Sequence, residues 1–382
     1  MTVIEFIEIC LALLIISGSA YWIIAIYSVN RFFKKTVHVA VSTEPVSILK
    51  PLKGIDPGLE ENIRSFCRQE YPEYEVILGF NGPDEKELYE AGQIAESIPF
   101  RNLSVISSYN ELGSNQKVSN LQGIVESACS QLVVLSDSDM RVGTEYLKTI
   151  VSEYKSDKAV GMVTCLYKIS DPGSIGAAFE SLTIALDFLP SVLVAERLEG
   201  VTFGLGASMI LSKKTLDEIG GFSAVADFLA DDYQIGNRIS AKGLRIVISQ
   251  YVVENIAGQM NFTEYFRHQL RWAKTVRASR PMGFFGSGIT HVFPFALILI
   301  FVRGVDIVSM SLLGLTLSLR CLMSVVVYRK VIGSLSWFKW LIILPVKDVT
   351  AFGIWLCAFA GSRISWRGAK YEILRSGKMR KV

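Results

Sequence analysis

The sequence has few histidines, few charges and no paired cysteine motif. Only three of its 382 residues are histidine, and they are scattered, which argues against an ordinary zinc site. The six cysteines include no C-x-x-C pair, and three fall in expected membrane or strand segments, so no disulfide framework is indicated. A net charge of +3 is too small to indicate nucleic-acid binding.

Charge is also missing from the N-terminal segment. Residues 4–29 contain only two acidic residues, both near the start, and no charge follows between Cys10 and Val29. This length of apolar chain predicts a transmembrane helix. A cleaved signal peptide would place basic residues before the apolar run, whereas Arg31 and Lys34 follow it. We therefore expect the N-terminus outside and the chain from residue 31 in the cytoplasm.

Further apolar segments lie in the second half of the chain. A stretch rich in glycine and proline at 281–288 predicts a hinge, and the apolar region after it runs nearly to Tyr328. We expect a membrane hairpin over about 289–328, then a re-entrant or interfacial segment, because the tail from residue 363 is basic. Residues 183–195 are too short and interrupted to span, and are expected in the membrane interface.

Between these regions, short apolar runs alternate with amphipathic stretches. This is the βαβ rhythm of a mostly parallel sheet, in which ligands gather beyond the carboxyl ends of the strands. The expected strands are 46–49, 74–78, 103–106, 132–135 and 160–164, and the expected helices lie near 59–69, 85–97, 116–129 and 144–155.

Two aspartates follow the expected strand 132–135. Asp137 and Asp139 are two residues apart, so in an extended segment their side chains project to the same side. Two adjacent carboxylates repel unless a cation joins them, and Mg²⁺ or Mn²⁺ prefers oxygen ligands and bridges diphosphates. The pair is therefore a candidate metal and diphosphate site. The alternative is an ordinary turn rich in serine and aspartate.

Other acidic residues stand before expected helices. Asp84 follows the strand at 74–78, and it either belongs to a site at the same sheet edge or caps the next helix. Asp231 and Asp232 precede a helix that ends near Lys242. Capping explains one of these two aspartates, and the other is a candidate general base.

An arginine and a tryptophan occur late in an expected helix from about 262 to 278. Arg271 suits bidentate contact with a diphosphate, and Trp272 suits the wall of a sugar or lipid pocket. The alternative is a buried tryptophan covered by an arginine stem.

The order of these residues resembles the D, D, D, (Q/R)xxRW signature of inverting nucleotide-sugar transferases, and more fully the ceramide glucosyltransferase family. The resemblance covers about 44–376. His268 stands where the signature has Gln or Arg. The matching stretches are Ser47-Ile-Leu-Lys-Pro-Leu-Lys-Gly54, Tyr71-Pro-Glu-Tyr-Glu75, Asn115-Gln-Lys-Val-Ser-Asn-Leu121, Ser136-Asp-Ser-Asp-Met-Arg-Val142, Ala230-Asp-Asp-Tyr233 and Ile364-Ser-Trp-Arg-Gly368.

The resemblance implies a GT-A-type α/β catalytic domain over 31–280, after a transmembrane helix at 1–30 and before C-terminal membrane helices and a basic tail at 281–382. It implies that Asp137 and Asp139 hold a divalent metal, Mg²⁺ or Mn²⁺, and that Asp84 lies on the nucleotide side. Asp232 is then the catalytic base, with Asp231 the next candidate. The remaining donor-binding candidates are Lys53, Lys117, Arg271 and Trp272.

By the same resemblance, the donor is UDP-glucose and the acceptor is a membrane lipid of the ceramide type. Transfer of N-acetylglucosamine to a hopanoid lipid is a close alternative. A processive polysaccharide synthase shares the signature but needs more spanning helices. A non-enzymatic sugar-nucleotide-binding scaffold is the fourth alternative. We expect an integral protein of the bacterial inner membrane whose catalytic domain faces the cytoplasm.

Overall fold

The computed structural model describes residues 1–34, 42–56, 58–82, 85–366, 368–374 and 377–382. The chain divides into two compact units. The helical unit comprises residues 1–35, 169–199 and 259–376, and the sheet unit comprises residues 36–168, 200–258 and 377–382. Residues 169–199 and 259–280, predicted from the sequence to belong to the catalytic domain, group with the helical unit in this division.

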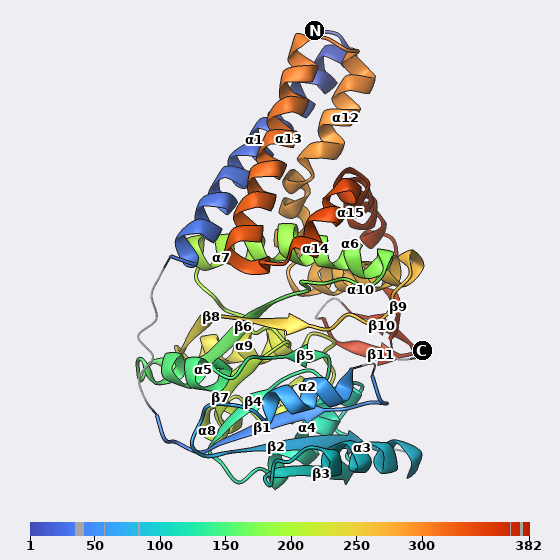
Figure 1. The fold of residues 1–382 in the computed structure, drawn as a ribbon. Helices are drawn as coiled ribbons and strands as arrows, with labels where there is room; N and C mark the ends of the chain where they lie inside the picture. Colours follow the sequence, from blue (N-terminus) through green and yellow to red (C-terminus); the bar gives the residue numbers. More distant parts are fainter. Residues whose placement is uncertain (35–41, 57, 83–84, 367, 375–376) are drawn as a thin grey trace. The chain divides into compact units, whose positions relative to one another are not determined.

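The sheet unit is built on eight strands in the order β3-β2-β1-β4-β7-β6-β8-β5. Strands β1 to β4 pair in parallel, as do β6 and β8, whereas β7 runs antiparallel to both β4 and β6 (Figure 1). The strands are β1 (Val46–Pro51), β2 (Tyr74–Asn81), β3 (Leu103–Ser108), β4 (Leu132–Leu135), β5 (Met140–Arg141), β6 (Val160–Lys168), β7 (Met209–Ser212) and β8 (Arg245–Asn255), with a short β11 (Met379–Lys381) near the C-terminus.

Helices connect these strands, as the alternating pattern predicts. They are α2 (Leu59–Phe66), α3 (Glu85–Ser97), α4 (Gln116–Ser127), α5 (Tyr146–Lys155), α8 (Lys213–Glu218), the 3₁₀ helix η2 (Phe222–Val225) and α9 (Asp231–Ala241). The central strands β1 and β4 are buried along their whole length. Side chains of β4, β7, α4 and α9 share one apolar core, which fixes the ends of these elements against one another.

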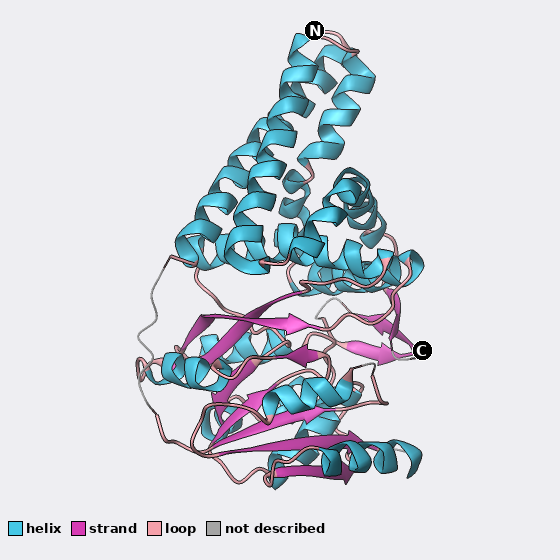
Figure 2. Cartoon of the chain, viewed as in Figure 1, coloured by secondary structure: helices cyan, strands magenta, loops and turns pink. Residues whose placement is uncertain are grey.

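The helical unit consists of helices apart from the hairpin of β9 (Arg363–Trp366) and β10 (Ala369–Ile373) (Figure 2). In chain order its helices are α1 (Val3–Phe32), α6 (Ile175–Thr183), the π-helix η1 (Ile184–Phe188), α7 (Leu189–Leu198), α10 (Phe262–Ser279), α11 (Pro281–Gly286), η3 (Ser287–Thr290), α12 (Val292–Arg303), α13 (Ile307–Val327), η4 (Tyr328–Ile332), α14 (Leu335–Phe338), η5 (Lys339–Ile343) and α15 (Leu344–Ala358). Helices α1, α12 and α13 lie side by side.

Among the described residues, four helical stretches are long and apolar enough to cross a membrane, and a fifth counts if a bent pair forms one span. The four are Val3–Phe32, Ile175–Leu198, Ile307–Ile332 and Leu335–Ala358, and the bent pair joins Pro281–Thr290 to Val292–Arg303 at 58°. The second stretch contains the predicted interfacial segment 183–195, and 78% of its apolar window is buried within the structure. It therefore packs mostly against protein.

Charges that interrupt the apolar sequence gather at one end of the three-helix group. Arg303 ends α12, and its guanidinium lies 2.7 Å from Glu8 Oε2 near the start of α1. The same guanidinium bonds to Asp306, which caps α13. The predicted hairpin of about 289–328 thus turns between α12 and α13, with its turn charges paired at the helix ends, where water can reach them.

Candidate active site

The aspartate motif occupies the carboxyl end of a buried central strand. β4 ends at Leu135, and Ser136 continues its pairing by donating its N–H to Leu49 O. Asp137 follows, and Asp139 immediately precedes β5. The motif therefore bridges two strands at the sheet edge where ligands of α/β proteins bind.

Asp139 is an enclosed carboxylate with spare acceptor capacity. Asn255 Nδ2 donates to its Oδ2 at 2.8 Å, while its Oδ1 is buried without a hydrogen-bond partner among the described residues. Burial raises the pKa of Asp139 to about 6, and the neighbouring Asp137 carboxylate adds to the shift. A buried carboxylate oxygen left without a partner is costly unless a cation or a donor group completes it.

Lys117 links the motif to the second acidic pair. Its ammonium lies 2.6 Å from Asp137 Oδ1 and 3.7 Å from Asp231 Oδ2. Burial by itself lowers the pKa of this lysine, but the carboxylates of Asp137, Asp231 and Asp232 outweigh it, so the pKa is raised above its usual value. Lys117 therefore remains a cation in the middle of the acidic cluster.

The start of α4 holds this lysine in place. Asn115 caps the helix by accepting hydrogen bonds from the backbone N–H groups of Lys117 and Val118. The amide of the same asparagine donates to Phe228 O at 2.8 Å and to Asp231 Oδ1 at 3.3 Å. One polar side chain thus fixes α4 relative to the first turn of α9.

The second acidic pair forms the first turn of α9. Asp231 is buried, and Asp232 Oδ2 accepts the Gly206 N–H at 2.6 Å. Burial raises the pKa of Asp232 to about 6, and the adjacent Asp231 carboxylate adds to the shift. A carboxylate whose pKa lies near physiological pH suits proton abstraction.

Gly206 allows the two acidic groups to approach each other. A Cβ at this position would lie 3.1 Å from Asp232 Oδ2, 3.3 Å from Asp137 Oδ2 and 3.3 Å from Lys117 Nζ. A side chain at this position would crowd all three groups, and glycine leaves the space between them open. Asp137, Asp232 and Lys117 therefore surround one common point.

Comparison with known proteins identifies the family. The profile described as glycosyl transferase family 21 matches residues 10–379. The chain belongs to glycosyl transferase family 21. It is 24% identical over 359 residues to ceramide glucosyltransferase 3 of Caenorhabditis elegans, covering 92% of this chain and 78% of that protein. Ceramide glucosyltransferase 1 of the same organism is 25% identical over 259 residues, covering 67% of this chain and 54% of that protein.

A solved structure shows the fold. The mannosyltransferase PcManGT of Pyrobaculum calidifontis, solved with GDP-mannose and Mn²⁺, has a TM-score of 0.55 at 16% identity, covering 94% of this chain and 99% of that chain. The predicted GT-A-type α/β fold with an N-terminal apolar helix is therefore confirmed. The predicted resemblance to ceramide glucosyltransferases is confirmed as well.

The remaining signature residues of this glycosyltransferase lie in the helical unit. Arg271 and Trp272 are half-buried on α10. The Trp272 ring lies 4.9 Å from that of His268 and 6.3 Å from that of Phe188, centroid to centroid. His268 Nδ1 lies 3.2 Å from the buried Glu180 Oε1. His268, which stands at the Gln or Arg position of the signature, thus has the carboxylate of Glu180 as a polar neighbour.

Of the two remaining predicted donor-binding residues, Lys53 is described by the structure and Asp84 is not. Lys53 follows β1 at the same edge of the sheet and is exposed. Asp84 lies outside the described residues, so its predicted nucleotide contact stays a prediction.

Lys50 is a site residue that sequence reasoning did not select. It is fully buried in β1, donates to Asp137 O at 2.8 Å, and has its ammonium 3.8 Å from the centre of the Phe66 ring. Burial lowers its pKa to about 7 against the attraction of Asp139 and Asp137. The sequence did contain a signal for Lys50, because it shows a lysine inside a mostly apolar strand. Buried lysines are rare unless they are paired with a carboxylate, so such a lysine indicates a nearby acidic group.

The cluster has an excess of negative charge. The four carboxylates of Asp137, Asp139, Asp231 and Asp232 face two ammonium groups, those of Lys50 and Lys117. Among the described residues, no group of three or more His, Cys, Asp or Glu side chains is arranged to hold a metal alone. A cation here would take part of its ligands from water or from a bound diphosphate, as Mg²⁺ commonly does.

Proposed function

We propose that this glycosyltransferase transfers glucose from UDP-glucose to the hydroxyl of a ceramide-type membrane lipid, with inversion at the anomeric carbon. The observation that carries the proposal is the meeting of Asp137, Asp232 and Lys117 around Gly206 in a chain of glycosyl transferase family 21. The relatives named as ceramide glucosyltransferases support the choice of donor and acceptor.

In this mechanism Asp232 is the general base. Its carboxylate takes the proton from the acceptor hydroxyl while that oxygen bonds to the anomeric carbon, and the bond from that carbon to the diphosphate oxygen breaks. A single displacement of this kind inverts the anomeric configuration. The Gly206 N–H fixes Asp232 Oδ2, which orients the base before the acceptor arrives.

Asp137 and Asp139 are the proposed metal ligands. Asp139 Oδ1 is buried and has no hydrogen-bond partner among the described residues, and this oxygen and the net negative charge of the cluster fit a divalent cation. Mn²⁺ accompanies the nucleotide sugar in the mannosyltransferase PcManGT. When bound, Mg²⁺ or Mn²⁺ would neutralise the donor diphosphate.

Lysine and arginine side chains supply the remaining positive charge in the proposal. Lys117 and Lys53 are proposed to contact the donor, and Asp84 to lie on its nucleotide side. Arg271 is proposed to stabilise the departing diphosphate, and Trp272 to form a wall of the substrate pocket. We further propose a bacterial inner-membrane protein with its catalytic domain in the cytoplasm, because Arg31 lies in the last turn of α1, Lys34 follows that helix, and the C-terminal tail is basic.

The test is direct turnover by purified full-length protein in lipid nanodiscs. The protein is incubated with UDP-glucose or UDP-N-acetylglucosamine and with ceramide or a hopanoid alcohol, and products are identified by mass spectrometry and NMR. We expect a β-linked glucosylceramide from UDP-glucose, formed roughly 10²-fold or more slowly by Asp232→Asn. A hopanoid product, a soluble polymer or no sugar transfer from any donor would each contradict the proposal.

A further inference from the structure

A cluster of charged side chains lies among the apolar helices of the helical unit, and the proposed chemistry uses none of it. Arg320 of α13 donates through Nε to Asp348 Oδ2 at 2.9 Å and through Nη2 to Asp187 Oδ1 at 3.0 Å. Lys347 of α15 lies 3.0 Å from Asp348 Oδ1 and also contacts Asp187. Two cations and two carboxylates make the cluster neutral, which reduces the cost of placing it in apolar surroundings.

Asp187 differs from the other three members in its exposure. Its side chain is 31% exposed, whereas those of Arg320, Asp348 and Lys347 are 7%, 9% and 0% exposed. Each carboxylate oxygen has two lone pairs, so Asp187 retains acceptor capacity on its exposed side.

The local chain geometry presents Asp187 in this way. It lies in the π-helical turn Ile184–Phe188, a conformation that often marks functional sites. Pro190 has no N–H to donate four residues back, so Leu186 O is free to accept from Arg320 Nη1 at 3.3 Å. The proline and the π-turn together open the helix and direct Asp187 into the cluster.

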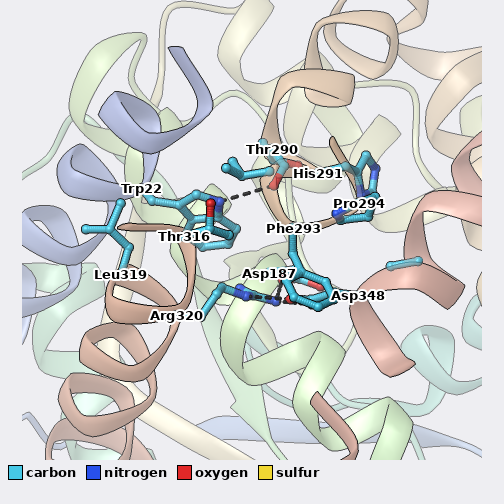
Figure 3. Close-up of a pocket in the computed structure, with 12 residues that line it drawn as sticks. Trp22, Asp187, Thr290, His291, Phe293, Pro294, Thr316, Leu319, Arg320 and Asp348 are labelled. Atoms are coloured by element: carbon cyan, nitrogen blue, oxygen red, sulfur yellow. Dashed lines mark hydrogen bonds and ion pairs between the residues drawn. The ribbon is translucent and has the colours of Figure 1, made fainter. Parts of the chain in front are cut away.

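A cavity of about 60 Å³ adjoins the cluster. Asp187, Arg320 and Asp348 line one side, and the remaining lining combines polar residues such as His291 and Thr316 with apolar ones such as Trp22, Phe293 and Leu319 (Figure 3). Trp22 lies against Arg320, whose guanidinium is 4.6 Å from the centre of the indole ring, and Trp22 also donates to Thr290 O at 3.1 Å. This volume fits a small group, and the side formed by Asp187, Arg320 and Asp348 offers that group hydrogen-bond partners.

We propose that this cavity binds the polar head of the acceptor lipid, with Asp187 accepting a hydrogen bond from a lipid hydroxyl that does not receive the sugar. This proposal rests on the proposed function, in which a membrane lipid is the acceptor. The cavity lies among helices apolar enough to span a membrane, so a lipid reaches it from the bilayer.

The charges favour an uncharged head that donates hydrogen bonds. Arg320 and Lys347 each contact two carboxylates, so neither cation is left over for a lipid phosphate. Asp187 offers an ionised acceptor, which binds hydroxyl and amide N–H groups more strongly than a neutral acceptor does. A lipid with a hydroxyl and an amide beside its acceptor hydroxyl has this chemistry.

The first experiment compares two acceptors in nanodiscs, N-hexanoyl-sphingosine and its 3-deoxy analogue. In the wild type we expect loss of the 3-hydroxyl to lower kcat/KM about tenfold or more, because a hydrogen bond to a charged acceptor is lost. In Asp187→Asn we expect the two acceptors to differ by less than about twofold. The KM for UDP-glucose is expected to be unchanged in both proteins. Equal discrimination in wild type and a folded Asp187→Asn overturns the proposal.

A second pair of variants leaves the charged cluster intact. Ala351→Leu adds volume at the cavity wall, whereas Val349→Leu adds a methylene at a 46% exposed position of the same helix. We expect Ala351→Leu to raise the acceptor KM about tenfold without changing the KM for UDP-glucose, and Val349→Leu to leave both unchanged. Identical behaviour of the two variants overturns the proposal even if Asp187→Asn does not fold.

Failure of the proposed function is recognised separately, as absence of glycolipid from wild-type protein with every acceptor. In that case binding is measured with a photoactivatable N-acyl-sphingosine. Crosslinks to residues 290–294 or 316–320 that weaken in Ala351→Leu, and not in Val349→Leu, support the cavity as a lipid site. Crosslinks that are equal in both variants, or that lie elsewhere, overturn it.

Discussion

At the scale of single residues, the surroundings of two aspartates in the candidate active site raise their pKa toward physiological pH. Asp139 and Asp232 both have a pKa of about 6, the first through burial beside Asp137 and the second through burial beside Asp231. Lys117 lies between the two pairs and limits the repulsion. The proposed metal ligands and the proposed base therefore lie on either side of one lysine.

We predict that Asp232→Asn lowers kcat by roughly 10²-fold or more while UDP binding changes little, because the amide cannot take the acceptor proton. Single-turnover kinetics and calorimetric UDP binding measure the two effects. The matched control is Asp217→Asn, on the short helix α8 of the same unit. A variant that loses UDP binding but keeps its rate at saturation would make Asp232 a donor ligand, with Asp231 the next candidate base.

The pH dependence follows from the raised pKa of Asp232. A base works only when ionised, and below a pKa of about 6 Asp232 is increasingly protonated. We therefore expect kcat/KM to fall about tenfold per pH unit below pH 6 and to level off above it. The profile is measured at saturating metal, because protonation of Asp139 also opposes metal binding. Activity that stays flat from pH 7 to pH 4.5 in stable protein would exclude Asp232 as the base.

Metal removal provides a third prediction at this scale. Without a cation, the carboxylates of Asp137 and Asp139 repel the donor diphosphate, so turnover should be lost in excess chelator and return with Mg²⁺ or Mn²⁺. Thermal unfolding with and without chelator checks that the fold survives. Full turnover by protein shown to be metal-free would contradict the proposal that these aspartates bind a metal ion needed for catalysis.

At the scale of elements, the regular βαβ half was predictable and the second half of the sheet was not. The predicted strands at 46–49, 74–78 and 132–135 begin at the residues where β1, β2 and β4 begin. Their apolar runs are buried on both faces, which gives a strong pattern. β7 has four residues and runs antiparallel between β4 and β6, and no local pattern distinguishes it from a loop.

The same contrast applies to the site. Asp137 follows strand β4, and Lys117 lies in the first turn of helix α4. Both positions are at the same edge of the sheet, so the topology alone predicts that the two residues lie close together. The contacts of Asn255 with Asp139 and of Asn115 with Asp231 depend on tertiary packing over more than a hundred residues of sequence. Leu193 belongs to the segment 183–195, which the sequence predicts in the membrane interface, but it is fully buried because the helix around it packs into the helical unit.

The charged cluster makes a prediction about the stability of the helices. Asp348→Asn leaves Arg320 and Lys347 buried beside one remaining carboxylate, so we expect the free energy of unfolding to fall by about 3–5 kcal/mol. Glu199→Gln breaks an exposed pair with Arg280 in the same unit and should cost about 1 kcal/mol or less. Thermal unfolding in one detergent compares the variants. Equal small shifts would show that the cluster contributes no more than a surface pair.

At the scale of the whole molecule, the chain passes repeatedly between its two units. Each unit contains three separate stretches of sequence, and the last six residues belong to the sheet unit. A fragment covering 31–280 would therefore lack the helices against which residues 169–199 and 259–280 pack, together with the C-terminal part of the sheet unit. The last six residues return to the sheet unit, which residues 36–168 begin.

The C-terminal residues give the last prediction, because they connect to the active site through a chain of hydrogen bonds. Met379 is buried, and its N–H donates to Asp227 O at 2.7 Å. Asp227 Oδ1 in turn accepts the Ser114 N–H at 3.0 Å, next to the Asn115 cap that fixes the helix carrying Lys117.

Deleting residues 377–382 should therefore displace the start of α4 and lower kcat about tenfold, since small misplacements of a positioned group are costly. Insertion of the helical unit into the membrane should be unaffected. Lys381→Ala, at an exposed tail position, is the matched control and should retain wild-type turnover. Turnover is measured in nanodiscs together with hydrogen exchange at residues 112–118, where we expect faster exchange in the deletion variant. If the shortened protein keeps both wild-type turnover and wild-type exchange, the tail does not support the site, and the remaining contacts of Asn115 with Ala226 and Phe228 are sufficient to hold Lys117 in place.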